Sequence, residues 1–156
     1  MNPTQTQVPV VPAQRMDLKQ VEPKAYQAMY ALERYLSSSQ LLPAHKELIK
    51  IRASQINGCA YCIALHTREA REAGESDKRM HALAAWHEAP YFTEEERAIL
   101  ALTEEVTRIS DHQVSDQVYD QAARLFGEAY LAQLIMAIIA INGWNRIAIT
   151  TRMTPE

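Results

Sequence analysis

Apolar residues recur along most of the chain at intervals of three and four, the spacing that places side chains on one face of an α-helix. No stretch alternates Val, Ile, Thr or aromatic residues with polar ones for long enough to indicate a β-strand. The pattern therefore predicts an all-α, single-domain bundle of about six to seven helices.

Residues that favour helix starts and helix ends divide this pattern into segments. Proline can occupy the first turn of a helix, Ser and Thr can cap it, and Gly can end it. Residues 1–15 are interrupted by prolines and show no helical spacing, so we expect an extended N-terminal arm followed by one helical domain over 16–156. The predicted helices span 23–37, 43–56, 59–73, 76–88, 93–109, 115–127 and 128–150.

Composition narrows the range of partners. The 156 residues carry a formal net charge of −3 without a block of Lys or Arg, which argues against a nucleic-acid partner. The N-terminus has no cationic residue ahead of an apolar run, so we expect no secretory signal and a cytoplasmic protein. The longest apolar run, 131–141, is shorter than the roughly 20 residues of a membrane span. We expect a core or subunit-interface helix there and no membrane association.

Both cysteines lie in one short stretch, "NGCAYCIALH", at 57–66. A helix turns by about 100° per residue, so Cys59, Cys62 and His66 fall within roughly 60° of one another on one face. Side chains three apart in a regular helix have Cβ atoms about 5–6 Å apart, whereas a disulfide needs about 3.5–4.5 Å. Cys59 can therefore bond to Cys62 only from the irregular start of the helix, next to Gly58. Because cytosolic thiols are kept reduced, such a bond would serve chemistry.

The start of the helix also favours a reactive thiol at Cys59. Free N–H groups at a helix start stabilise a thiolate, which lowers the pKa of the thiol. His66 lies one turn after Cys62 and can exchange protons near neutral pH. If 43–56 and 59–73 form an antiparallel hairpin, Glu47 lies level with about residue 68 and approaches His66. The expected relay is Glu47, His66, Cys62 and Cys59.

Other interpretations of these residues remain. The cysteines can be ordinary packing residues, or Cys59, Cys62 and His66 can bind zinc with Glu47 or another histidine as fourth ligand. Zinc is less favoured because the chain has no second cysteine pair. Covalent haem attachment needs a histidine where Ile63 stands. The other histidines show no metal-ligand spacing, so we expect neither a metal nor another cofactor.

In the last predicted helix, Asn142, Asn145 and Arg146 form a polar face on an apolar segment. Buried polar groups need hydrogen-bond partners. We therefore expect them to make a hydrogen-bonded subunit contact rather than to act at the thiols.

In their order and spacing, Glu47, Cys59, Cys62 and His66 resemble the Glu–Cys–x–x–Cys–x–x–x–His signature of the AhpD-like alkylhydroperoxidases, within the carboxymuconolactone decarboxylase superfamily. The resemblance is clearest over 40–110. It implies an all-helical subunit that assembles into homo-oligomers, as dimers, trimers or hexamers. It also implies thiol-dependent reduction of a hydroperoxide substrate without haem or metal, the disulfide being reduced by an external dithiol, which a lipoyl-bearing protein supplies in the best-known members.

The order in which the sulfurs react stays open. The resemblance implies that Cys62, next to His66, attacks the peroxide and that Cys59 resolves the product. The helix-start argument instead favours Cys59 as the more acidic thiol. Tyr61 occupies a position where the best-known members have a histidine.

Two further functions are compatible with the sequence. One is a carboxymuconolactone decarboxylase-like enzyme acting on a lactone acid, which would not need its thiols. The other is a non-catalytic redox-sensing or stress-response interaction protein whose dithiol forms a disulfide without turnover.

Overall fold

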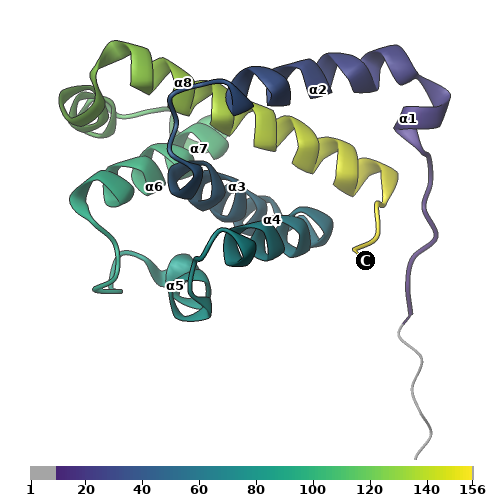
Figure 1. Cartoon of the computed structure of the whole chain (residues 1–156), viewed down its shortest axis with the longest axis horizontal. Coiled ribbons are helices and arrows are strands. Elements are labelled where there is room, and N and C mark those ends of the chain that lie inside the picture. Colours follow the sequence, from purple (N-terminus) through teal and green to yellow (C-terminus); the bar gives the residue numbers. More distant parts are fainter. Residues whose placement is uncertain (1–9, 156) are drawn as a thin grey trace, which may run out of the picture.

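The computed structural model describes residues 10–155, which form helices and no strand (Figure 1). The all-α prediction is confirmed. The α-helices are α1 (Leu18–Val21), α2 (Pro23–Ser37), α3 (Pro43–Asn57), α4 (Ala60–Glu72), α5 (Asp77–Ala82), α6 (Glu94–Thr107), α7 (Ile109–His112) and α8 (Asp116–Thr151), with a 3-10 turn, η1 (Leu83–Ala85), after α5.

Most predicted helices match the observed ones to within about two residues, and the differences have local causes. Helices α1 and α7 have four residues each, too few to show a periodic pattern. The helix expected over 76–88 changes to a 3-10 turn after Ala82. Residues three apart eclipse one another in a 3-10 turn, and here both Leu83 and Trp86 are buried.

The two helices expected over 115–127 and 128–150 are joined in α8. The junction is Gly127, whose φ of 72° and ψ of 166° are not helical and are accessible mainly to glycine. The sequence located this break correctly, but the helix resumes at once on its far side instead of after a loop.

Helices α3 and α8 form the centre of the bundle, and α2 lies along α8 (Figure 1). Ile49 of α3 and Leu134, Ile138 and Ile141 of α8 are fully buried in the larger core cluster. A second cluster joins α3 and α6 to α5 and η1 through Ile51, Leu83 and Leu100, among others. Helix α4 also packs against α3, and the two cysteines lie at the start of α4.

Helix α8 is the one helix of the described residues that is long and apolar enough to cross a membrane, with a mean hydropathy of 1.6 over its best window. Core helices pass the same test. In this structure α8 packs against α2, α3, α4 and α6, and it contains the fully buried polar residue Asn145.

The N-terminal arm expected over 1–15 is described only from residue 10 onward, and residues 1–9 lie outside the described residues. The backbone N–H of Arg15 donates to the carbonyl of Thr151 at 2.8 Å, which attaches this part of the arm to the end of α8. The boundary between arm and domain at residues 15 and 16 stays a prediction.

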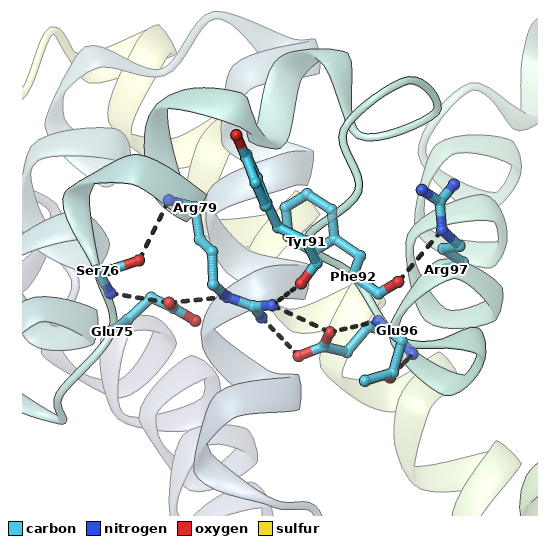
Figure 2. A network of polar contacts seen from close by, with 8 residues as sticks. Glu75, Ser76, Arg79, Tyr91, Phe92, Glu96 and Arg97 are labelled. Atoms are coloured by element: carbon cyan, nitrogen blue, oxygen red, sulfur yellow. Dashed lines mark hydrogen bonds and ion pairs between the residues drawn. The ribbon is translucent and has the colours of Figure 1, made fainter.

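A polar network fixes the long connection between α5 and α6 (Figure 2). The guanidinium of Arg79 donates to Glu96 at 2.6 Å, to Glu75 at 2.9 Å and to the carbonyl of Tyr91. Glu96 and Thr93 also form a capping box at the start of α6. One guanidinium thus holds α5, the connection and the start of α6 together.

A second polar network lies between α3 and α8. The side-chain amide of Asn57 donates to Asn142 and to Asn145 at 2.9 Å each. Asn145 in turn donates to the hydroxyl of Ser54 at 2.9 Å, and Asn142 donates to Thr107 at 3.0 Å. The expectation that Asn142 and Asn145 make a subunit contact was wrong, because their partners lie within the same chain, at the ends of α3 and α6. Arg146 is exposed and donates to Asn142.

We expect Asn145→Ala to lower the free energy of unfolding by about 2–3 kcal/mol, because it leaves the buried hydroxyl of Ser54 without this partner and removes one of the two hydrogen bonds that the Asn57 amide donates. Thr150→Ala, an exposed change on the same helix, should stay within about 0.5 kcal/mol of the parent. Urea unfolding followed by circular dichroism measures both, and equal losses in the two variants would contradict the assigned role of the amide network.

Candidate active site

The turn between α3 and α4 sets the position of the cysteines. Gly58 adopts a left-handed conformation with φ 72° and ψ 33°, and the N–H of Cys59 donates to the carbonyl of Ser54 at 2.9 Å. This six-to-one hydrogen bond is the Schellman pattern that ends a helix at glycine. The chain therefore reverses within two residues, and α4 packs antiparallel to α3.

Cys59 and Cys62 form a disulfide across the first turn of α4, with their Cα atoms 5.4 Å apart. Cys59 is the N-cap residue of α4, and its extended backbone (φ −86°, ψ 95°) gives the departure from helical geometry that the bond requires. Its sulfur also accepts a hydrogen bond from the N–H of Cys62 at 3.3 Å. Both side chains are almost completely buried, with 1% of Cys59 and 3% of Cys62 exposed.

His66 lies one turn after Cys62 and faces two carboxylates. Its Nδ1 is 2.8 Å from Oε2 of Glu69, one turn further along α4, and 3.6 Å from Oε2 of Glu47 on α3. The structure thus brings Glu47 near His66, although the hydrogen bond is with Glu69, a residue that the sequence did not single out. Lys50 lies 3.6 Å from the other oxygen of Glu47.

These neighbours decide the charge of His66. Burial alone would lower the pKa of the imidazole, but the carboxylates of Glu47 and Glu69 outweigh burial and the opposing charge of Lys50. The pKa of His66 is therefore raised above its usual value. The hydrogen bond from His66 in turn lowers the pKa of Glu69. The arrangement favours an imidazolium beside a carboxylate.

A cavity of about 340 Å³ opens beside Cys62 and His66. Its walls include the aromatic rings of Tyr26, Tyr30 and Trp144, which contact one another. A second cavity of about 340 Å³ adjoins Cys59 and is bounded by the end of α8 and by Pro12 of the arm. Tyr61 and Met153 line both cavities. The two sulfurs therefore adjoin different cavities.

The structure also bears on the metal interpretation. Among the described residues, the ligand-type side chains that gather closely are Glu47, His66 and Glu69, whose ligand atoms lie within 4.8 Å of one another. Neither sulfur belongs to this group, and each sulfur is bonded to the other. In this state the cysteines cannot serve as the zinc ligands considered from the sequence. His45, another buried histidine, hydrogen-bonds Tyr130 instead.

Comparison with known proteins identifies the family. Residues 23–105, which include Glu47, both cysteines and His66, match the model of the carboxymuconolactone decarboxylase family. The chain belongs to this family. The uncharacterised protein YdfG of Bacillus subtilis is 39% identical over 137 residues, which cover 88% of this chain and 93% of YdfG.

Solved structures place the chain among the AhpD-like members of the family. A protein of Agrobacterium tumefaciens described as a putative antioxidant defence protein AhpD is 37% identical, with a TM-score of 0.90 over 92% of this chain and 99% of that one. A peroxidase-related protein with an alkylhydroperoxidase AhpD core, from Ralstonia eutropha, is 25% identical, with a TM-score of 0.74 over 89% of this chain and 74% of that one. The predicted family is confirmed.

Two features of the site escaped sequence reasoning. Glu69 lies three positions after His66, a spacing that brings helical side chains into contact, and the sequence could have indicated it by this spacing. The amide of Asn57 gives no such signal, because its partners Asn142 and Asn145 are more than 80 residues away along the chain.

The raised pKa of His66 predicts how stability depends on pH. Because the folded state holds this proton more tightly, the stabilisation is fully present below the usual pKa of about 6.5 and is lost as pH rises through the folded pKa. We expect the difference in unfolding free energy between the parent and His66→Gln to be largest at acidic pH and to shrink above neutrality. Urea unfolding of both proteins over pH 6–9 tests this, and a difference that grows with pH would contradict it.

Proposed function

We propose that the chain is a thiol-dependent peroxidase that reduces hydroperoxides with the Cys59–Cys62 dithiol. The observation that carries the proposal is the disulfide at the start of α4, which adjoins a cavity shared with His66. The descriptions of its structural relatives as antioxidant defence and peroxidase-related proteins support the same chemistry.

The first step of the proposed reaction takes place at Cys62. In the reduced protein, protonated His66 stabilises the Cys62 thiolate, which attacks one peroxide oxygen. The O–O bond breaks, Cys62 is oxidised to a sulfenic acid, and the other oxygen leaves as an alcohol after taking a proton from His66. We assign this step to Cys62 because it adjoins both the cavity and His66.

The second step takes place at the helix start. The N–H of Cys62 stabilises negative charge on the sulfur of Cys59, which attacks the sulfenic sulfur of Cys62. The S–O bond breaks, the hydroxyl leaves as water after protonation, and the disulfide of the present structure results. The helix-start argument and the family order thus concern different steps: Cys59 is activated for resolution and Cys62 for attack on peroxide.

The third step returns the protein to its reduced form. An external dithiol attacks the disulfide, forms a mixed disulfide and is itself oxidised to a disulfide, releasing both thiols. A lipoyl-bearing protein is the reductant that the family resemblance favours. We place the cycle in the cytoplasm, where such dithiols are kept reduced.

The test follows single turnover in Cys59→Ser and Cys62→Ser. Each reduced variant receives one equivalent of cumene hydroperoxide with dimedone, which traps sulfenic acid, and is analysed by mass spectrometry. We expect an adduct on Cys62 in Cys59→Ser and none in Cys62→Ser, together with continued peroxide consumption by the parent when dihydrolipoamide is supplied.

The double variant Cys59→Ser/Cys62→Ser is the control for chemistry that does not need sulfur. No adduct and no loss of peroxide in either single variant would contradict the peroxidase proposal. Formation of the disulfide by the parent without turnover would favour a redox sensor. An adduct on Cys59 alone would reverse the order of the sulfurs.

We further propose that the chain assembles into a homo-oligomer, as the family resemblance implies. Ile139 and Ile149 of α8 are among the large apolar side chains that the single chain leaves exposed, and burial of such side chains is a usual source of subunit affinity. Sedimentation equilibrium should give a mass of two or more chains. Ile139→Lys should lower that mass, whereas Ser110→Lys, an exposed change on α7, should not; a monomeric parent would contradict the proposal.

A further inference from the structure

His66 is held by a carboxylate that does not belong to the Glu–Cys–Cys–His signature. Of the two acids near its Nδ1, only Glu69 lies at hydrogen-bond distance, at 2.8 Å against 3.6 Å for Glu47. Oε2 of Glu47 is buried and has no hydrogen-bond partner among the described residues. The signature glutamate is thus close to the histidine, but it does not hold it in this state.

We propose that Glu69 is a positioning residue that accepts the Nδ1–H hydrogen bond of His66 and leaves Nε2 as the nitrogen that exchanges a proton at Cys62. The inference rests on the proposed function and assigns one further residue to it. Its chemical basis is that the hydrogen bond made by one imidazole nitrogen selects the tautomer and therefore the protonation of the other.

The charges around His66 explain why Glu69 matters more than its surface position indicates. Lys50 lies between Glu33 and Glu47, at 3.8 and 3.6 Å from their carboxylates, so both of these acids share its positive charge. Glu69 has no such ion pair with Lys50 within 4 Å, and its hydrogen bond with His66 is the shortest contact in the cluster. Glu69 is therefore the acid in direct contact with the imidazole, although both carboxylates raise the pKa of His66 and the charges of Lys50 and Arg68 also act on Glu69.

Every element that packs near His66 contributes to its electrostatic surroundings. The groups are Glu33 and Arg34 from α2, Glu47 and Lys50 from α3, and Arg68, Glu69 and the disulfide sulfur of Cys62 from α4. Helix α8 presents the uncharged indole of Trp144, whose N–H donates to Glu33. The phenols of Tyr26, Tyr30 and Tyr61 line the same cavity.

Glu69 is also the most exposed of the three groups. The side chain of Glu69 is 43% exposed, whereas those of Glu47 and His66 are 16% and 10% exposed. A proton that Nε2 of His66 donates to the leaving alcohol is replaced at Nε2 from the side of the cavity. Glu69 keeps the hydrogen bond from Nδ1–H throughout and so holds the imidazole in place.

The experiment measures the protonation of His66 directly, without peroxide. The disulfide form of each protein is treated with a chelator and titrated by NMR, and the His66 signal is assigned from its absence in His66→Gln. We expect the titration midpoint of His66 to move to lower pH in Glu69→Gln. Glu72→Gln, an exposed change on the same helix, is the matched control and should leave the midpoint unchanged.

Glu47→Gln completes the comparison. A midpoint that falls further in Glu69→Gln than in Glu47→Gln supports the assignment to Glu69. A midpoint in Glu69→Gln equal to that in Glu72→Gln overturns it, as does a larger fall in Glu47→Gln. Thermal unfolding of each variant verifies that the fold is retained.

The pH profile of the reaction gives a second readout. If His66 donates the proton to the leaving alcohol, the rate of peroxide consumption falls as pH rises through its pKa. In Glu69→Gln this fall should begin at lower pH, and the rate at pH 7.5 should drop by about tenfold. If no protein in the series consumes peroxide, the proposed function fails while the NMR comparison still decides the role of Glu69.

Discussion

The geometry of the site depends on the buried amide of Asn145. Asn145, on the longest helix, is fully buried and bonds Ser54 and Asn57 at the end of α3. Asn57 immediately precedes the left-handed turn at Gly58, and the carbonyl of Ser54 accepts the N–H of Cys59 after that turn. The turn places Cys59 at the first free N–H groups of α4. Because amide hydrogen bonds are directional, they fix the turn more closely than apolar packing alone could. The hydrogen bonds of Asn145 therefore help to set the positions of the disulfide and of His66 one turn later.

The acid and base groups divide between the two helices of the hairpin. Helix α4 contributes both sulfurs, His66 and Glu69, while α3 contributes Glu47 and Lys50. His66 is hydrogen-bonded to a carboxylate on its own helix and lies near a second carboxylate on the neighbouring helix, so negative charge acts on it from two directions. The positive charge of Lys50 partly offsets the negative charge of Glu47 on the neighbouring helix. Small movements of α4 against α3 would therefore change the balance between the two acids, and with it the protonation of the imidazole.

The sequence could predict which segments form helices, and that Cys59, Cys62 and His66 share one helix face, because both depend on local spacing. Pro23, Pro43 and Gly58 indicated where helices begin and end, and the i, i+3 and i+4 rules placed Cys62 beside Cys59 and His66. The approach of Glu47 to His66 followed from the antiparallel hairpin. The partners of Asn145 could not be predicted, because a buried asparagine looks the same in a sequence whether it faces a subunit or its own chain. The bend at Gly127 was located, yet the continuation of the helix depends on tertiary packing.

The seclusion of the two sulfurs has a consequence for the choice of reductant. A thiolate must approach a disulfide sulfur closely before exchange can occur, and access is one of the factors that set its rate. Only 1% of the Cys59 side chain is exposed. The cavity through which a thiolate would reach its sulfur is bounded by the end of α8 and by Pro12 of the arm. In the proposed cycle, a reductant would have to fit beside the end of α8 to reach this sulfur, so its shape would matter as well as its concentration.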